Sequence, residues 1–521
     1  MSKDQLPAEP DSVRVQPPIA AAQPDQLAAV ARLRGLAAAD VSRARVLELA
    51  CGDGGNLIPL AERYPQATFL GIDPSSRSIA SATAEAEALE LTNIEFRQSS
   101  LLALSDSPGP FDYILAHGVY SWVDAASRQR LLEICRDSLA PDGVAYINYL
   151  ANPGWQAHRV LGAAMRYEGH GRASWPERMV AGRELAEFLR ASLDAESPYG
   201  DWLGSAVSPV LAQSDEYVRQ QYLRPTHAVY LREFLAEANS HALAYLGDCT
   251  AGVRYTDFLH PRTERALDAL VTEPLAKEQV RDILQNKGYR QTLLGHQGVS
   301  LERTLLVERA RGLYLSGRLV AQDPDAGGDK AAPTTFTAAD GLSVTTPLPL
   351  MKAAIRHLAG EWPGAVEFDQ LVHTVVGAAA AARGGELKQE DVQRLQINLL
   401  QCCSGGVLRM HGAAPSFVAR VSDRPAAGRL ARWRSARSDV LTNRKHEQVR
   451  LDPVDRNLLQ YLDGTRTVSE VIDVLAEAAE RGTLVVVEDG REAPLERRRE
   501  ILQAAVPESL ERLAAHAFLI A

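Results

Sequence analysis

The stretch Val46-Leu47-Glu48-Leu49-Ala50-Cys51-Gly52-Asp53-Gly54-Gly55-Asn56 decides the fold of this chain. It begins as an apolar, strand-like run and continues into a glycine-rich turn that opens a helix. Glycines allow a tight turn and let the backbone approach a ligand closely, and the start of a helix offers free N–H groups. Because nucleotide-like ligands bind at such turns in α/β folds, the stretch predicts a ligand-binding turn after a parallel strand.

The spacing of the glycines excludes two common nucleotide motifs. No glycine stands three positions after Gly54, as a dinucleotide fingerprint requires, and no Gly-Lys-Ser/Thr follows to cradle phosphates. A second predicted strand ends in Gly71-Ile72-Asp73, which places a carboxylate beside the glycine turn. In related folds such a carboxylate accepts hydrogen bonds from ribose hydroxyls. The alternative is that Asp73 caps the helix that starts near Ser76.

Strand-like runs alternate with helical stretches between residues 41 and 150, which is the pattern of a parallel sheet covered by helices. The predicted strands are 45–50, 67–72, 93–97, 111–116 and 143–149, and the helices between them are 57–64, 76–91 and 127–139. This order predicts a doubly wound, Rossmann-like α/β domain.

Long helical segments dominate residues 155–287, such as 183–193 and 230–245, and predict an all-helical module. Strand-like patterns return at 290–296 and 313–320, so the helical module is expected as an insertion before the last strands of the first domain. A linker rich in Asp, Gly, Pro and Ala follows at 322–333.

Beyond the linker the chain reads as a separate unit. Three helices at 351–359, 368–382 and 388–402, with a short strand at 406–410, predict a winged-helix-like fold. Two more helices at 455–462 and 469–481 precede a Val-rich strand at 484–487. Residues 420–450 hold nine basic residues against three acidic ones. This stretch is either a solvated connector or a surface for an acidic partner.

Composition excludes several classes of protein. The 521 residues carry 66 Asp and Glu against 56 Lys and Arg, and this net charge of −10 argues against a general nucleic-acid binder. No apolar run approaches the roughly 18 residues needed to insert into a membrane, and the first 25 residues lack the apolar core of a signal peptide, so we expect a cytoplasmic protein. The five cysteines lack metal-ligand spacing, which predicts reduced thiols and no metal site.

The glycine turn resembles the Glu/Asp-x-Gly-x-Gly-x-Gly loop of class I S-adenosylmethionine methyltransferases, with Ala50 in place of the first glycine. The later run Ala116-His117-Gly118-Val119-Tyr120-Ser121-Trp122-Val123 is similar to bacterial methyltransferases that carry a methyltransferase regulatory domain. Further matches are Asn152-Pro153-Gly154-Trp155 and Tyr289-Arg290-Gln291-Thr292-Leu293-Leu294. Members of that family include lysine methyltransferases acting on bacterial outer-membrane proteins.

The resemblance implies three domains: a methyltransferase domain at 25–169, a mainly helical regulatory domain at 170–321 and a winged-helix-like region at 334–521. It also implies S-adenosylmethionine as the cofactor. The residues expected to hold the cofactor are Glu48, Ala50, Gly52, Gly54, Asn56, Asp73, Ser100 and His117. Ser100 stands where the family commonly has an acidic residue that holds the adenine amino group, and Glu48 is expected to organise the loop or meet the amino group of the methionine moiety.

The resemblance also leads us to expect catalytic roles for His117, Tyr120 and Asn148. His117 or Tyr120 would help a lysine lose its proton, or solvent would accept that proton, and Asn148 would orient the nucleophile. The aromatic rings of Tyr120, Trp122, Tyr149 and Trp155 either surround the methyl group or an ammonium group, or pack between sheet and helices.

Three functions follow as hypotheses. The first is a methyltransferase that acts on lysine side chains of a protein, the second a small-molecule methyltransferase, and the third a cofactor-binding protein without turnover. The large non-catalytic portion favours a protein substrate, because a polypeptide needs an extended surface. No nucleic-acid partner is expected, and a homodimer is left open.

Overall fold

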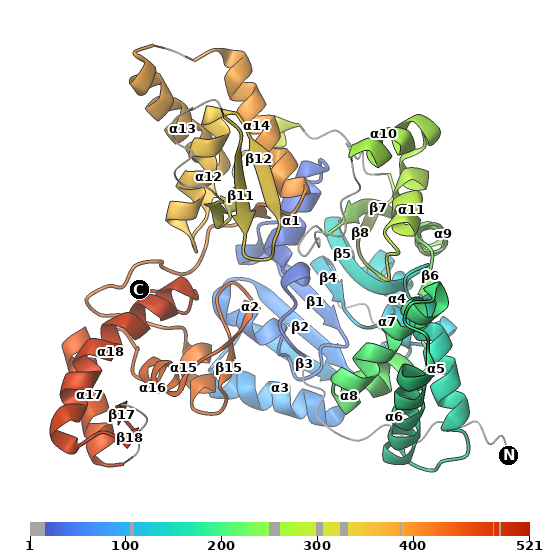
Figure 1. Ribbon diagram of the computed structural model, residues 1–521, viewed down its shortest axis with the longest axis horizontal. Coiled ribbons are helices and arrows are strands. Elements are labelled where there is room, and N and C mark those ends of the chain that lie inside the picture. The colour runs from blue at the N-terminus through green and yellow to red at the C-terminus, as the bar shows by residue number, and fades with distance from the viewer. Residues whose placement is uncertain are drawn as a thin grey trace. The chain divides into compact units, whose positions relative to one another are not determined.

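The computed structural model describes residues 16–104, 109–249, 261–298, 306–322, 332–385, 387–482, 484–488 and 491–521. Figure 1 labels its helices and strands, and the chain divides into two compact units. Of the described residues, the first unit holds 99–104, 109–248 and 261–298, and the second holds 16–98, 249, 306–322, 332–385, 387–482, 484–488 and 491–521.

The second unit holds three parallel strands in the order β3-β2-β1. Strands β1 (Arg45–Leu49), β2 (Thr68–Asp73) and β3 (Ile94–Gln98) pair in register, with Leu47 opposite Leu70. Helix α2 (Leu57–Arg63) connects β1 to β2, and helix α3 (Ser76–Ala88) connects β2 to β3. Four of the five residues of β1 are buried, as expected for a parallel strand covered on both faces.

In the first unit, β4 (Phe111–Ala116) runs parallel to β5 (Leu139–Ala151), and helix α4 (Ala125–Ser138) connects them. Strand β8 (Tyr289–His296) is antiparallel to β5, β7 (Leu243–Asp248) is antiparallel to β8, and the short β6 (Ala228–Val229) pairs with β5. The mixed, Rossmann-like sheet confirms the predicted fold class.

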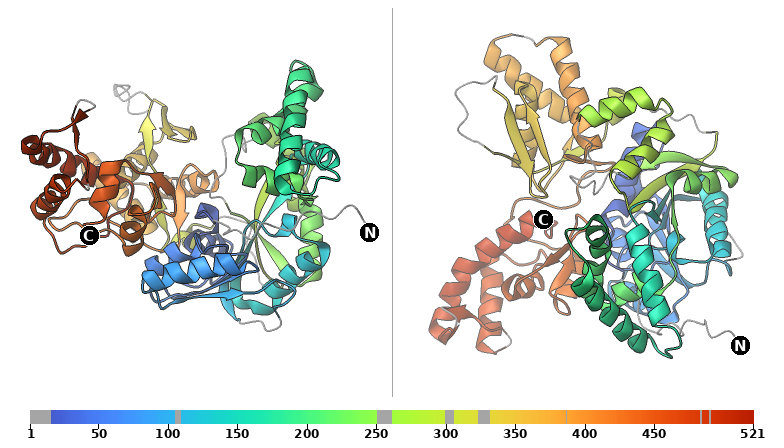
Figure 2. Two further views of the ribbon diagram at one scale, coloured as in Figure 1. Left: turned by 90° about the horizontal axis from the view of Figure 1, so that it is seen from below. Right: turned by 45° about the vertical axis from the view of Figure 1, so that its right-hand side comes forward.

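Helices dominate the middle of the chain, as predicted. Four of them build a hydrophobic core around Trp175, Met179, Leu203 and Val207, and Figure 2 shows them as green ribbons packed along one another. They are α5 (Gln156–Glu168), α6 (Trp175–Ser192), α7 (Pro198–Ala212) and the short α8 (Asp215–Val218), which continues into the π-helical turn η4 (Arg219–Leu223). Helices α10 (Pro261–Leu270) and α11 (Pro274–Leu284) precede β8.

One helix of the middle region is shorter than the sequence predicts. Residues 230–245 are not a single helix, because α9 (Leu231–Ser240) ends and the chain turns into β7. Ala242, with φ of +56°, makes this turn in the left-handed region, where a helix cannot continue. The predicted insertion before the last strands is right for β8. It is wrong for 313–320, because β9 (Tyr314–Ser316) and β10 (Leu319–Ala321) belong to two small sheets of the second unit.

The chain after residue 306 forms a second hydrophobic core around Leu315, Ile355, Phe368 and Leu399. Strand β10 pairs with β11 (Thr334–Ala338), which pairs with β12 (Ser343–Thr346), while β9 pairs with β13 (Val366–Glu367) and β14 (Arg409–His411). The three predicted helices are α12 (Pro349–Glu361), α13 (Phe368–Arg383) and α14 (Gln389–Ser404).

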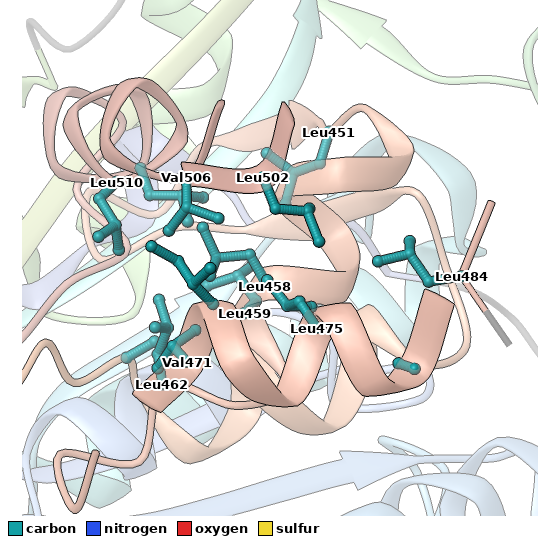
Figure 3. Packing of buried hydrophobic residues seen from close by; sticks show 14 of the residues in the cluster. Leu451, Leu458, Leu459, Leu462, Val471, Leu475, Leu484, Leu502, Val506 and Leu510 are labelled. Atoms are coloured by element: carbon teal, nitrogen blue, oxygen red, sulfur yellow. The ribbon is translucent and has the colours of Figure 1, made fainter. Parts of the chain in front are cut away.

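The carboxyl-terminal part has its own core, which Figure 3 shows from close by. Leu458, Leu475, Leu502 and Leu510 meet there from helices α16 (Pro453–Leu459), α17 (Val468–Glu480) and α18 (Leu495–Ala515). Two hairpins accompany these helices: β15 (Val440–Thr442) with β16 (Gln448–Arg450), and β17 (Val487–Glu488) with β18 (Arg491–Glu492).

The basic stretch 420–450 is not a solvated connector. Its helix α15 (Arg429–Ser435) and the β15–β16 turn place arginines against acidic residues of α2 and α3. Arg434 Nε lies 2.7 Å from Glu85 Oε1, and Arg444 Nη1 lies 3.1 Å from Glu62 Oε2. Leu430 of α15 is buried with Ile58 and Leu89. The acidic partner of this stretch is therefore a surface of the same chain.

The remaining elements of the described residues are short, apart from one helix. They are η1 (Ala20–Ala22), α1 (Pro24–Leu33), η2 (Val41–Arg43), η3 (Tyr120–Trp122) and η6 (Val307–Ala310). Among the helices of the described ranges, each is too short or too polar to cross a bilayer.

Candidate functional site

The turn after β1 takes a backbone path that suits glycine. Gly52 and Gly54 have φ of +56° and +75°, and Ala50 has φ of +60°. The Gly54 N–H donates to the carbonyl of Cys51 at 3.0 Å, and the Ile58 N–H then donates to the carbonyl of Gly54 at 2.9 Å. Ala50 therefore keeps the left-handed conformation expected of a glycine, at a cost of about 1–2 kcal/mol.

The glycines of this region also lie against neighbouring side chains. A Cβ on Gly54 would lie 2.6 Å from Cζ of Phe96 on β3, so a Gly54→Val change collides first with the protein itself. A Cβ on Gly55 would lie 1.8 Å from the carbonyl oxygen of Gln16. The segment before η1 thus crosses the turn, and the Gln16 N–H donates to Asp53 Oδ1 at 2.8 Å.

Asp73 ends β2 with a buried carboxylate that is tied to the glycine turn. Its Oδ2 accepts from the Gly52 N–H at 3.0 Å, and its Oδ1 accepts from the Ser75 N–H at 2.9 Å. The cap of α3 is Ser75, whose hydroxyl accepts from the Ser78 N–H, so Asp73 does not fill the alternative N-cap role. A carboxylate offers about four lone-pair sites. The two that remain fit the hydroxyl pair of a ribose.

Glu48 organises the turn through Asn56. Both residues are buried, and Asn56 Nδ2 donates to Glu48 Oε1 at 2.9 Å. Asn56 Oδ1 then accepts from the Ile19 N–H at 2.9 Å and from His446 Nε2 at 2.7 Å. Because Asn56 Nδ2 is the donor to Glu48, its oxygen must be an acceptor, and this fixes the proton of His446 on Nε2.

His446 is a site residue that the sequence did not reveal. It lies at the turn between β15 and β16, far from Asn56 along the chain, with φ of +63°. Burial lowers its pKa to about 3, so the ring is neutral in the folded protein. The one signal for His446 in the sequence is its position within the basic stretch 420–450. That stretch indicated a surface for an acidic partner but did not identify the partner.

In the first unit, the ends of β4 and β5 carry a network of polar and aromatic side chains. His117 Nδ1 lies 3.1 Å from the Tyr146 hydroxyl, which also accepts from Gln291 Nε2 at 3.1 Å. Asn148 Nδ2 donates to the Tyr289 hydroxyl at 3.1 Å, and Asn148 Oδ1 accepts from the Gly118 N–H at 2.5 Å. The predicted residues His117 and Asn148 thus lie in neighbouring parts of one network.

Tyr120 lies outside this network. Its hydroxyl donates to Glu237 Oε2 at 2.6 Å, and its ring meets Phe234 edge to face at 5.0 Å between centroids. Burial and the hydrogen bond to Glu237 raise its pKa well above the usual range. Tyr149 is buried beside it and stacks on Phe234 at 4.1 Å. Tyr120 and Tyr149 therefore both pack against Phe234.

The other predicted residues have simpler surroundings. Ser100 is exposed, and its hydroxyl accepts from the Ala103 N–H at 3.2 Å, which closes a turn after β3. Trp155 stacks on His158 at 4.3 Å and donates to Thr226. The five cysteines are buried free thiols. Within the described ranges, no group of three or more His, Cys, Asp or Glu is arranged to hold a metal ion.

Three family models match the chain. They are a methyltransferase domain at residues 46–143, a predicted methyltransferase regulatory domain at 214–296 and a PKMT C-terminal winged helix domain at 423–518. The sequence predicted a winged-helix-like fold from the three helices α12–α14. The winged helix model instead matches residues 423–518, which follow these helices along the chain.

Relatives match along the whole chain or along its catalytic part. An uncharacterized protein of Rickettsia prowazekii (strain Madrid E) is 28% identical over 515 residues, which is 96% of this chain and 92% of the relative. The trans-aconitate 2-methyltransferase of Azoarcus sp. (strain BH72) is 30% identical over 40% of this chain and 78% of its own length. The structure of PKMT2 from Rickettsia typhi in complex with AdoHcy, 24% identical, shares the fold over 98% of this chain and 100% of that one, with a TM-score of 0.83.

The mixed sheet, the glycine turn with Asp73 and the matched methyltransferase domain define a class I S-adenosylmethionine-dependent methyltransferase. Its further domains narrow the assignment. The chain belongs to the methyltransferases that combine this domain with a methyltransferase regulatory domain and a PKMT C-terminal winged helix domain.

Proposed function

We propose that this methyltransferase transfers methyl groups to lysine side chains of a protein. The observation that carries the proposal is the match at 423–518 to the winged helix domain of PKMT, the abbreviation of protein lysine methyltransferase. The full-length similarity in fold to PKMT2 of Rickettsia typhi supports it. The regulatory and winged-helix regions would supply the extended surface that a polypeptide acceptor needs.

The proposed cofactor residues have different tasks. Asp73 would accept hydrogen bonds from the ribose hydroxyls with the lone pairs that Gly52 and Ser75 leave. Gly52, Gly54 and Ala50 would shape the turn, while Glu48 and Asn56 hold it through their buried hydrogen bond. Ser100 and His117 complete the set predicted from the sequence. The bound cofactor would supply an electrophilic methyl group, whose bond to sulfur breaks as the bond to the acceptor nitrogen forms.

The acceptor lysine must present a neutral amine, whereas its reference pKa is about 10.4. The lysine therefore loses one proton to a base or to solvent before attack, and the nitrogen lone pair forms the new bond to carbon. We propose His117 as the base, because the Tyr146 hydroxyl at its Nδ1 orients the ring. Asn148 would hold the backbone after β4 through the Gly118 N–H and so position His117.

The main test is a methylation assay with radiolabelled S-adenosylmethionine and a proteome extract. We expect label on protein bands, with the methyl group on lysine by mass spectrometry. Label on carboxylate or arginine would overturn the lysine assignment. His117→Ala should lower turnover more than cofactor affinity, whereas Tyr120→Phe should change stability instead.

A small-molecule acceptor is the second candidate. The similarity to trans-aconitate 2-methyltransferases over the catalytic part favours a small carboxylic acid as that acceptor. The same assay separates the candidates, because label in small metabolites without a labelled protein band would support this one. Cofactor binding by calorimetry without transfer to either fraction would support a binding protein without turnover.

A further inference from the structure

A cavity of about 400 Å³, open solvent at its mouth included, lies within the second unit. Gln23 and Gln26 line it from the start of α1, and Arg63 lines it from the end of α2. Strand β14 adds Arg409 and His411. The cavity contains none of the residues proposed above to bind the cofactor or the acceptor.

The lining carries positive charge. Arg63, Arg409, Arg444 and Lys445 line the cavity, and none of the lining residues in the described ranges is a carboxylate. Three carboxylates form ion pairs with these cations. Asp25 lies 3.7 Å from Arg63, and Glu62 lies 3.1 Å from Arg444. Glu447 pairs with two cations, Arg409 at 2.9 Å and Lys445 at 3.1 Å. Four cations against three carboxylates leave a surplus positive charge.

Most of this charge is removed from water. The side chains of Arg63, Arg444 and Lys445 are only 7%, 15% and 16% exposed. The Nε–H groups of Arg63 and Arg444 have no hydrogen-bond acceptor among the residues that the structure describes. Burial also lowers the pKa values of Arg444 and Lys445. Buried cations with unused donors are costly, and an anion in the cavity would offset that cost.

Apolar side chains also line the cavity. They are those of Pro363, Ala365, Ala413, Pro415 and Phe417, and the hydroxyl residue Ser316 completes the lining. Cationic and apolar side chains thus line the same cavity, and together they are complementary to a small anion that carries an apolar group.

We propose that this cavity is a second ligand site, which binds a small organic molecule carrying a phosphate or carboxylate group. Arg63, Arg409, Arg444 and Lys445 bind the anionic head. The site does not depend on the identity of the methyl acceptor. Because Arg444 and Lys445 directly precede His446, a ligand here contacts the turn that holds Asn56.

Calorimetry on the full chain tests the site, with saturating S-adenosylmethionine present to occupy the cofactor turn. The probes are phenyl phosphate, benzoate and the neutral benzyl alcohol. We expect one or both anions to bind and benzyl alcohol not to bind. Binding of phenyl phosphate alone would show that the site is specific for a phosphate group. Binding of benzoate alone would show that it is specific for a carboxylate, and binding of both would show a general oxyanion site. Equal binding of the alcohol, or no binding of either anion, would overturn the proposal.

Variants locate the bound anion. Arg63→Gln and Arg409→Gln should each weaken binding of that anion at least tenfold. The matched control is Arg424→Gln, an exposed arginine of the same unit outside the cavity, which should leave affinity unchanged. Arg409 is 45% exposed, so its variant tests the site even if Arg63→Gln fails to fold. Equal affinities of Arg409→Gln and Arg424→Gln would place the anion elsewhere and overturn the proposal.

Discussion

Asp73 is the residue on which cofactor binding depends most directly. Asp73→Ala should weaken S-adenosylmethionine binding by about 1.5–3 kcal/mol, the scale of a hydrogen bond to a charged group. Calorimetry measures the loss. Ser75→Ala is the matched control, because it removes the cap of α3 and costs about 1 kcal/mol of stability without touching the ribose site. Unchanged affinity in a folded Asp73→Ala protein would refute the ribose assignment.

His446 gives the stability of the protein an acid dependence. Its pKa is about 3 in the folded protein, against a reference value of about 6.5, so the unfolded chain takes up the proton first as the pH falls. The stability contributed by the neutral ring is therefore fully present above pH about 6.5 and is lost toward pH 3, by about 1.4 kcal/mol per pH unit.

His446→Gln tests this dependence, because glutamine keeps a donor for Asn56 but does not titrate. We expect the difference in unfolding free energy between the wild type and this variant to shift steadily in favour of the variant as the pH falls from 7 to 5. Urea unfolding at several pH values measures it. Parallel pH profiles of the two proteins would show that His446 is not the titrating group.

At the scale of elements, the turn between β15 and β16 and helix α15 dock on α2 and α3 through ion pairs of different burial. Arg444 and Glu62 are 15% and 13% exposed, whereas Arg429 and Glu90 are 50% and 80% exposed. Solvent screens an exposed pair, so its coupling is typically about 0–1 kcal/mol, while close pairs in one network couple by up to about 3 kcal/mol.

Double-mutant cycles compare the two pairs directly. The cycle of Arg444→Gln with Glu62→Gln should give a coupling energy of about 1–3 kcal/mol in denaturant unfolding. The cycle of Arg429→Gln with Glu90→Gln should give less than about 0.5 kcal/mol. Equal coupling in the two cycles would mean that burial does not govern this docking.

At the scale of the whole molecule, the winged-helix region contributes contacts that support the methyltransferase domain. A chain that ends at residue 422 loses Leu430 and Trp433 from the cluster with Ile58, and it loses the hydrogen bond from His446 to Asn56. We expect this chain to unfold at a lower temperature and to bind S-adenosylmethionine more weakly than the His446→Gln variant of the full chain. Calorimetry measures the affinity of both chains for S-adenosylmethionine. Equal affinities of the truncated and the full chain would contradict this expectation.

Much of the fold was predictable because its signals are local. The alternation of apolar runs and helical stretches, together with the glycine turn, predicted β1 to β5 and helices α2 to α4 within a few residues. The segment 230–245 shows the limit of such signals. Leu243 to Asp248 are as compatible with a helix as with a strand when taken alone, and pairing with β8 made them β7. Tertiary pairing overrides weak local preference in such a segment.

The sequence by itself determined the class of the protein, because the turn Gly52–Gly54 and the carboxylate of Asp73 follow directly from residue types next to their strands. Only the tertiary structure decided what supports that turn. Asn56 and His446 form a hydrogen bond across most of the chain, and no local periodicity records such a pairing. The charge of the basic stretch 420–450 can likewise be read from the sequence. Its ion-pair partners Glu62 and Glu85 cannot, because only the folded chain brings α2 and α3 next to this stretch.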